Sequence, residues 1–222
     1  KNVAVLADYA QRETTKREHT ALIRRHYGYS EFSDPHWTFR LSRMLYTRAW
    51  ISNERPSLMF DFSTAWLIQH KVLLPGATTL SRLISEIRER SDNRLWRCLS
   101  SLPNREQKAN LETLLQVPDG QRTSGFDRFR KGPTTISGPA FNLSVQRYLD
   151  LRAFGIHEID FSHIPPVRLK NLARHAGVIS MHKIARMPEN KRTAILLAFA
   201  KVYETVALDD SLDVLDMRIT EI

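Results

Sequence analysis

The chain has 222 residues, 42% of them hydrophobic, which is enough to bury one large core or two modest ones. Its 33 Lys and Arg against 24 Asp and Glu give a formal charge of +9, which predicts a polyanionic partner, nucleic acid before an anionic membrane surface. The single cysteine, Cys98, excludes an internal disulfide framework and a cysteine-rich zinc module, and no apolar run is long enough to span a membrane. We therefore expect a globular protein of a reducing cytoplasm.

The charge is unevenly distributed along the chain. Residues 203–222 hold six acidic side chains and one arginine, so the positive excess lies in the preceding part. Arginine is more frequent than lysine, and a guanidinium can bind a phosphate or a guanine edge with two hydrogen bonds where an ammonium acts as a point charge. This favours nucleic acid as the partner of the basic part and indicates a different neighbour for the acidic segment.

Helical signals begin with the capping box Thr15-x-x-Glu18, which predicts a helix ending near Tyr27 with Gly28 as its left-handed stop. A second helix is predicted over residues 37–50 from its apolar spacing. Basic side chains fall on the exposed faces of both helices. They form the first group of predicted DNA contacts: Lys16, Arg17, Arg24, Arg40 and Arg43.

Pro75 and Gly76 separate two predicted helices, residues 56–71 and the stretch that runs to residue 90. Apolar side chains at positions 80, 83, 84 and 87 form one buried stripe of the second helix, and a hydroxyl at position 78 or 79 would cap it. Helix, tight turn and helix is the order of a helix-turn-helix, which presents its second helix to a DNA groove. The alternative is an ordinary helical hairpin whose Arg82 and Glu86 pair on a solvated surface.

Helical segments continue to the end of the sequence, and almost no alternating pattern predicts strands. They cover residues 92–102, 104–116, 124–131, 139–155, 167–176, 181–186 and 188 onward, and Gly177 is expected to stop the helix from 167. Two Gly-Pro steps in 131–139 indicate a boundary or hinge. We therefore predict an all-α, bundle-like fold with helix-turn-helix-like pairs and two subdomains, 1–132 and 133–222, the second running into a truncated long helix.

A second helix-turn-helix candidate is the stretch 169–187. Ala173 and Gly177 are four residues apart, as the small residue and the turn glycine are in many bacterial repressors. Lys183 stands where an apolar side chain should face inward, so the match is off by one residue. The alternative is that the basic side chains of this stretch bind phosphates or face water.

The sequence contains no credible active site. Asp209, Asp210, Asp213 and Asp216 form the only carboxylate cluster, and the first, third and fourth of them share a helical face. No further acid or histidine lies nearby as a partner, which favours a solvated or partner-facing surface over a catalytic metal site. The eight histidines lack the spacing of a zinc site, and no glycine-rich phosphate loop or nucleophile elbow occurs. The four tryptophans, at 37, 50, 66 and 96, could stack on bases, but their positions beside apolar stripes favour core packing.

Six stretches, in their order, spacing and number, resemble the N-terminal region of the Tn3 family of replicative bacterial transposases. They are LADYAQRETTKREHTALIRRHYGY at 6–29, WTFRLSRMLYTRAWISNERP at 37–56, LLPGATTLSRLISEIRE at 73–89, KGPTTISGPAFN at 131–142, PPVRLKNLARHAG at 165–177 and ALDDSLDVLD at 207–216. The resemblance implies a helical region that recognises the terminal inverted repeats of the transposon. It also implies that the acidic catalytic triad of the family's RNase H-like nuclease fold, which takes the metal ions, lies downstream.

The resemblance further implies a piece of a longer protein that binds DNA and is not itself an enzyme, because no position here matches the triad. Its expected partners are double-stranded DNA of the transposon ends and the remainder of the transposase chain, with no membrane. Monomer and homodimer on DNA both stay open. We expect no cofactor, and a location in the bacterial cytoplasm with nucleoid association when the protein is bound to DNA.

On DNA, the helix after Pro75-Gly76 would meet base edges in a major groove through Ser81, Arg82, Ser85 and Arg88. Its start, at Thr78 and Thr79, would point at a phosphate. The first two helices would hold the DNA backbone together with a basic set further along the chain: Arg168, Lys170, Arg174, Lys183 and Arg186. The alternative function is a helical protein-interaction module that assembles the transposition complex, has only non-specific DNA affinity and docks through the acidic last helix.

Overall fold

The computed structural model describes residues 13–220, and in this range the chain is helical and forms no β-strand. One isolated parallel bridge joins Ser30 to Val72. The helices gather into two compact units, and the first contains the described chain up to Ala49 together with Glu54–Arg88. The second contains Trp50–Asn53 and the described chain from Glu89 onward. The predicted all-α fold is confirmed.

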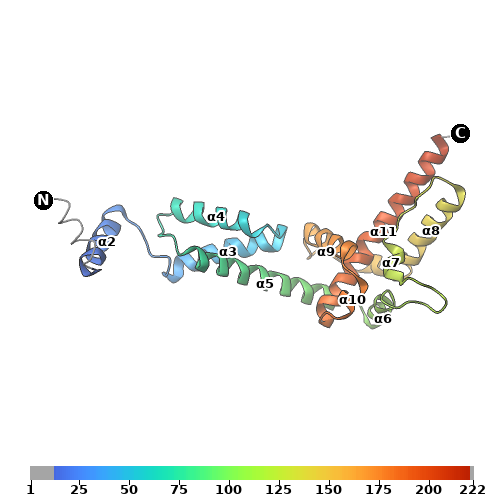
Figure 1. Ribbon diagram of the computed structural model, residues 1–222, viewed down its shortest axis with the longest axis horizontal. Coiled ribbons are helices and arrows are strands. Elements are labelled where there is room, and N and C mark those ends of the chain that lie inside the picture. Colours follow the sequence, from blue (N-terminus) through green and yellow to red (C-terminus); the bar gives the residue numbers. More distant parts are fainter. Residues whose placement is uncertain (1–12, 221–222) are drawn as a thin grey trace. The chain divides into compact units, whose positions relative to one another are not determined.

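Figure 1 shows the helices of the first unit: α2 (Glu13–Tyr27), α3 (Pro35–Ser52), α4 (Pro56–Gln69) and the first part of α5 (Ala77–Ser101). α2 ends where Gly28 takes a left-handed φ of 70°, as predicted. Thr15 lies inside α2, so the predicted capping box at Thr15 is wrong. The Ser30 N–H donates to the Lys71 carbonyl at 2.9 Å, which ties the segment after α2 to the turn between α4 and α5.

The core of the first unit is a cluster of apolar side chains from α3, α4, α5 and the turn before α5. Its buried members are Leu41, Leu45, Ala49, Met59, Trp66, Leu67, Val72, Leu80, Ile84 and Ile87. The predicted inward stripe of α5 is confirmed. On α4, Leu58 is exposed while Ser63 and Leu67 are buried. Apolar residues surround this helix, so their spacing alone does not select a buried face.

α5 starts earlier and runs further than the sequence indicates. The Gly76 carbonyl accepts hydrogen bonds from the N–H groups of Thr79 and Leu80 at 2.9 and 3.1 Å, so Thr79 and its neighbour Thr78 lie in the first turn rather than at the cap. The helix then continues unbroken to Ser101 and merges two predicted segments, the stretch to residue 90 and 92–102. No glycine or proline between its ends interrupts it.

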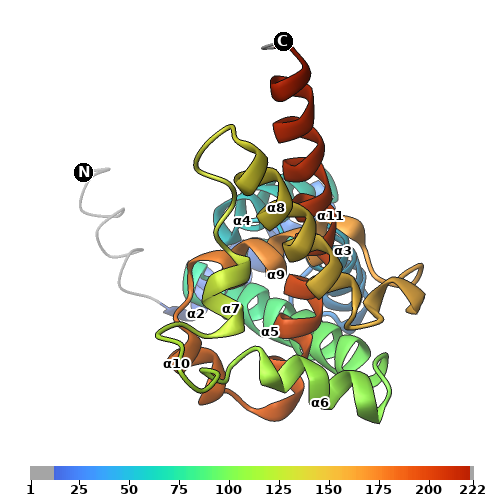
Figure 2. The same cartoon turned by 90° about the vertical axis from the view of Figure 1, so that its right-hand side faces the viewer.

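The second unit continues with the last part of α5 and a series of helices that includes the long α11 (Figures 1 and 2). They are α6 (Arg105–Thr113), α7 (Gly125–Phe129), α8 (Gly138–Arg152), the 3₁₀ helix η1 (Ile156–Glu158), α9 (Pro166–Val178), α10 (Met181–Ala185) and α11 (Glu189–Thr220). Local capping fixes several of the starts. Asn104 and Gln107 form a reciprocal capping box on α6, and the Ser137 hydroxyl accepts from the Ala140 N–H at the start of α8.

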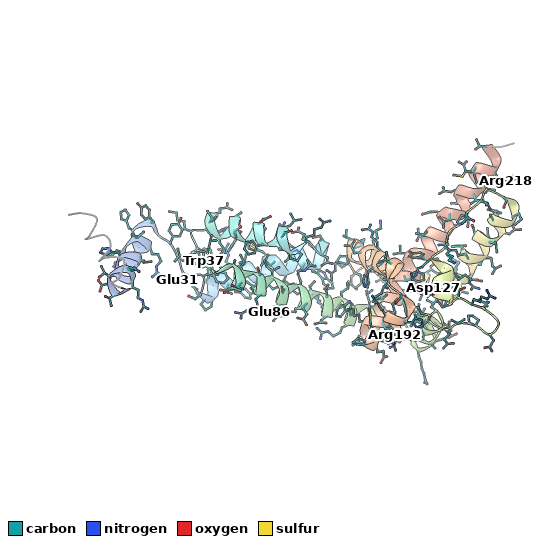
Figure 3. The ribbon with its side chains drawn as sticks, viewed as in Figure 1. Glu31, Trp37, Glu86, Asp127, Arg192 and Arg218 are labelled. Carbon is teal, nitrogen blue, oxygen red and sulfur yellow. The ribbon has the colours of Figure 1, made fainter. Side chains whose placement is uncertain are left out.

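α11 supplies the centre of the second core. Residues 193–200 are all buried, because a helix that is apolar all round must be surrounded by other elements. Phe199 packs on Phe126 of α7, with ring centroids 4.5 Å apart. Arg192, labelled in Figure 3, pairs with Glu112 of α6 at 2.8 Å. Despite this apolar run, none of the described helices is long and apolar enough to cross a membrane.

The Gly-Pro segment 131–139 lies within the second unit, where it connects α7 to α8. Side chains on both sides of it share one core, with Phe126 and Phe129 before it and Leu151 and Ile156 after it. The compact units therefore divide the chain at 88/89, whereas the predicted subdomains divide it at 132/133. Gly-Pro steps mark where a helix ends, but shared burial decides which helices belong to one core.

Gly177 lies inside the last turn of α9, which continues to Val178, so the predicted helix stop at Gly177 is wrong. The role of this glycine is spatial. A Cβ at this position would lie 2.7 Å from the hydroxyl oxygen of Tyr203 on α11. The missing side chain is what allows α9 and α11 to pack this closely.

Gly177→Ala is expected to lower the free energy of unfolding by about 1 kcal/mol. Overpacking against Tyr203 costs roughly 1–3 kcal/mol, and the better helix propensity of alanine offsets up to about 1 kcal/mol. Urea unfolding of the two proteins measures the difference. Gly177→Ala in a Tyr203→Phe background is the control, since removal of the hydroxyl oxygen should abolish the loss. An unchanged unfolding midpoint for the single variant would contradict the close contact.

Candidate nucleic-acid interface

The exposed face of α2 carries a dense group of the predicted DNA contacts. Lys16, Arg17, Thr20 and Arg24 line a shallow surface hollow of about 340 Å³. Their spacing of one, three and four residues places them on one face of the helix. The Thr20 hydroxyl donates to the Lys16 carbonyl at 2.7 Å, and Arg24 forms an ion pair with Glu31. Three cationic side chains around one hollow suit an anionic oxygen of the DNA backbone.

Arg40 and Arg43 on α3 are both exposed, as predicted. The Arg40 guanidinium lies 5.4 Å from the ring centroid of Trp37 and 5.8 Å from that of Trp66. A cation held near aromatic rings keeps its charge at the surface and is partly ordered before any anion binds to it. All four tryptophans belong to or pack against the two cores, so the prediction that they serve core packing is confirmed.

The helix pair on either side of Pro75 and Gly76 does not show the crossing of a helix-turn-helix. α4 and the first part of α5 lie side by side and nearly antiparallel in Figure 1, whereas the helices of that motif cross at about 90–120°. Ser81 and Ser85 of α5 share a hollow with Asp61 of α4. Part of the predicted groove-reading face therefore lies beside an acidic residue, and the helix-turn-helix prediction is not confirmed.

Arg82 is clearly directed outward, with 74% of its side chain exposed. Its Nε lies 4.0 Å from the carboxylate of Glu86, which is itself 65% exposed, and Figure 3 shows Glu86 on the outer side of α5. This is the pair that the hairpin alternative expects. An exposed pair at this distance is weak, so a phosphate or a base edge could displace the carboxylate from Arg82.

The remaining predicted contacts on α5 divide into two kinds. Thr78 and Thr79 are exposed in the first turn, where the positive end of the helix dipole favours an anion, although the Thr79 N–H already donates to the Gly76 carbonyl. Arg88 is half-buried, and its guanidinium donates to the Glu54 carbonyl in the connection between α3 and α4. Arg88 therefore stabilises the packing of the first unit and is not placed to read bases.

The prediction that Arg168 is an exposed DNA contact is wrong. Arg168 is 2% exposed, and its Nη2 donates to the Asp92 carboxylate at 2.5 Å. A basic residue in the first turn of a helix is usually solvated, but α9 turns this one into the core of the second unit, where Asp92 of α5 balances its charge. From this position Arg168 cannot contact DNA.

The other basic residues of the 168–186 stretch are exposed. Lys170 and Arg174 are one turn apart on α9, Lys183 lies on α10, and Arg186 follows α10. α10 has five residues, about one and a half turns, which is too short for a recognition helix that lies along a groove. Phosphate contact is therefore the role that this surface can perform.

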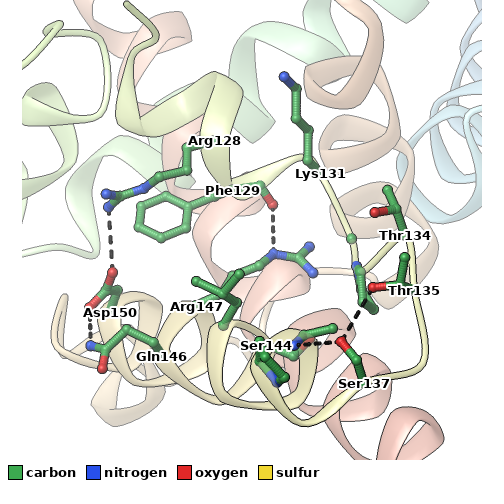
Figure 4. Close-up of a pocket in the computed structure, with 15 residues that line it drawn as sticks. Arg128, Phe129, Lys131, Thr134, Thr135, Ser137, Ser144, Gln146, Arg147 and Asp150 are labelled. Atoms are coloured by element: carbon green, nitrogen blue, oxygen red, sulfur yellow. Dashed lines mark hydrogen bonds and ion pairs between the residues drawn. The ribbon is translucent and has the colours of Figure 1, made fainter. Parts of the chain in front are cut away.

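One hollow was not foreseen from the sequence. It lies between α7, α8 and the connection that joins them, has a volume of about 440 Å³, and is shown in Figure 4. Arg128 pairs there with Asp150 at 3.4 Å, and Arg147 donates to the Phe129 carbonyl at 3.0 Å and to Asp210 at 2.5 Å. These partners offset the charge of both arginines, so the hollow gives no strong indication of a phosphate site.

The acidic groups form no metal centre in the described range. Asp209, Asp213 and Asp216 are exposed along α11. Between residues 13 and 220, no three His, Cys, Asp or Glu side chains lie close enough together to hold a metal ion. The pKa of Asp160 lies below its ordinary value because the N–H and hydroxyl of Ser162 donate to its carboxylate, an arrangement confined to one surface turn.

Fold and surface together define a class of protein: an all-α molecule of two compact units, each with exposed basic side chains, as in proteins that hold a polyanion. A family model described as a domain of unknown function, DUF4158, matches residues 1–87, and the first compact unit ends at Arg88.

Three curated relatives are transposases. The transposase for transposon gamma-delta of Escherichia coli strain K12 is 59% identical over 218 residues, 98% of this chain and 22% of that protein. The transposase for transposon Tn4556 of Streptomyces fradiae is 38% identical over 103 residues, 46% of this chain and 12% of that protein. The transposase for transposon Tn1546 of Enterococcus faecium is 25% identical over 218 residues, 96% of this chain and 22% of that protein.

These relatives are Tn3-family transposases, and this chain is similar to them. The resemblance seen in the six sequence stretches is thereby confirmed. The chain spans 22% of the length of the gamma-delta and Tn1546 transposases.

Proposed function

We propose that the chain is a DNA-binding part of a transposase and that it binds the terminal inverted repeats of its transposon as double-stranded DNA in the bacterial cytoplasm. The observation that carries this proposal is the 59% identity to a transposase along 98% of the chain. The exposed basic side chains on both units support it, because neutralisation of phosphates by Lys and Arg dominates DNA affinity. Strand cutting and joining are assigned to the part of a transposase that this chain does not span, so the proposal includes no cofactor and no catalysis here.

The proposed contacts divide into two roles. Arg82 on the outer face of α5 meets a base edge, and the start of α5 at Thr78 and Thr79 meets a phosphate. Arg88 and Arg168 are left out because their guanidinium groups serve packing. Ser81 and Ser85, exposed on the same helix as Arg82, stay beside it as candidate base contacts. The basic members on the other helices and after α10 hold the DNA backbone: Lys16, Arg17, Arg24, Arg40, Arg43, Lys170, Arg174, Lys183 and Arg186.

Fluorescence anisotropy tests the proposal with two labelled duplexes of equal length, one carrying the terminal inverted repeat of the host transposon and one carrying the same bases in scrambled order. We expect a preference for the repeat that persists at physiological salt, with an affinity that falls steeply as salt rises. Equal and weak binding of both duplexes that vanishes with salt would refute recognition of the repeat.

Arg82→Ala is expected to lower the preference for the inverted repeat over the scrambled duplex by roughly tenfold, since a good bidentate contact to a base discriminates by about 1–3 kcal/mol. The salt dependence should stay unchanged. Glu86→Ala is the matched control, because it removes the ion pair of Arg82 but no proposed base contact. If Arg82→Ala instead weakens both duplexes equally and reduces the salt slope by about one, Arg82 holds a phosphate.

A second candidate function is a helical assembly module of the transposition complex with only non-specific DNA affinity. The observation that favours it is the outer part of α11, where apolar side chains including Leu212 and Ile219 are exposed beside acidic ones. Both functions are compatible in one chain, since the DNA contacts and this apolar surface use different residues.

A further inference from the structure

The burial of α11 changes after residue 200. Residues 193–200 are buried on every side of the helix, whereas beyond them the buried residues are Glu204, Ala207, Ser211 and Val214. Their spacing of three, four and three residues is one helical stripe, so the outer part of α11 packs on the second unit along one side only. Figure 2 shows the last turns of α11 extending past α8.

An apolar stripe runs along the open side of these turns. Leu208, Leu212, Leu215 and Ile219 are spaced by four, three and four residues, and 38%, 54%, 40% and 62% of their surface is exposed. This is the spacing of the two core positions of a coiled-coil heptad, which places all four side chains in one seam. A helix side that faced only water would carry polar residues. The seam therefore has the pattern of a helix that lacks its partner.

Carboxylates border the seam along one edge. Asp209, Asp213 and Asp216 are exposed there, while the opposite edge is occupied by the side that packs on the second unit. Asp210 is not part of this border, because it pairs with Arg147 of α8. A helix lying in the seam would thus have its own flanking residues next to a row of negative charge.

This border argues against a second copy of the chain as the occupant. In an antiparallel pair of α11 helices, Asp209 of one copy would face Asp216 of the other. In a parallel pair, Asp209 would face the position of Glu204, whose carboxylate is buried against the second unit and already pairs with Arg152, so this position offers Asp209 no opposite charge. Like charges that face each other across a helical seam are destabilising, and opposite charges at the same positions set the choice of partner.

We propose that the seam Leu208, Leu212, Leu215 and Ile219 is a docking surface for an amphipathic helix whose own leucine and isoleucine seam is bordered by Lys or Arg. The apolar contact supplies the affinity, and Asp209, Asp213 and Asp216 select a basic partner over an acidic one. The proposal does not depend on DNA binding, and its test contains no DNA.

The test uses the full chain and two labelled synthetic peptides, each of three heptads with leucine and isoleucine in the seam. One peptide carries Lys at the flanking positions and the other carries Glu. We expect the Lys peptide to bind, the Glu peptide to bind at least about tenfold more weakly, and Leu212→Glu to weaken the Lys peptide about tenfold or more. Leu58→Glu on α4 is the matched control, since Leu58 is also 54% exposed, and it should leave binding unchanged.

A triple change, Asp209→Asn, Asp213→Asn and Asp216→Asn, tests the charge selection separately from the apolar seam. It should bring the affinities of the two peptides close together without abolishing binding. Failure of both peptides to bind, or binding that Leu212→Glu leaves unchanged, would overturn the proposal. So would a concentration-dependent dimer of the wild-type chain in sedimentation velocity that Leu212→Glu dissolves, because a second copy would then occupy the seam.

Discussion

The triple replacement Arg17→Ala, Arg40→Ala and Arg43→Ala is expected to weaken DNA binding on the order of a hundredfold. All three side chains are exposed on helices of the first unit. A phosphate contact of about 1 kcal/mol from each would sum to roughly a factor of a hundred, since about 1.4 kcal/mol is a tenfold change. Phosphate contacts carry no sequence information, so the inverted repeat and the scrambled duplex should lose affinity by the same factor.

The salt dependence gives this experiment a second readout. Loss of three phosphate contacts should reduce the slope of log affinity against log salt by about 2.7, because each contact contributes about 0.9. The matched control replaces three exposed arginines outside the proposed interface, Arg90, Arg105 and Arg122, and removes the same net charge. If the control weakens binding as much as the test variant does, DNA responds to the overall charge of the chain and the proposed contact surface is wrong.

Arg168→Ala is expected to lower the free energy of unfolding by about 2–3 kcal/mol. The change leaves the Asp92 carboxylate without the guanidinium that balances it at 2.5 Å and opens space in the core of the second unit. Breaking a fully buried pair costs about 3–5 kcal/mol, and the value here is lower because Asp92 keeps 33% of its side chain exposed. Urea unfolding measures the loss.

Arg174→Ala is the control for this prediction, since Arg174 is an exposed arginine on the same helix and should change stability by less than about 0.5 kcal/mol. The order of the two effects should be reversed for DNA affinity. Arg174→Ala should weaken binding, whereas Arg168→Ala, assayed where it is still folded, should not. A stable Arg168→Ala protein that has lost DNA affinity would restore Arg168 to the interface.

Much of the local structure could be predicted from the sequence. The left-handed stop at Gly28, the apolar stripe of α5 and the helical starts after the prolines depend on signals that act within a few residues. The same local signals failed where a residue has more than one role. The sequence around Gly177 predicts a helix stop, but its missing Cβ makes room for Tyr203, which is distant in the sequence. α4 has apolar residues on several sides, so only its neighbours decide which side is buried.

The sequence by itself thus determined the all-α class, the basic character and the similarity to Tn3-family transposases, because composition, helical periodicity and residue identity all lie along the chain. Only the tertiary structure decided which basic residues remain available to a partner. Arg168 is buried against Asp92, which lies 76 residues earlier, and Arg88 is engaged by the Glu54 carbonyl. Burial and charge balance depend on residues brought together by folding, and no local pattern around an arginine records which distant group will face it.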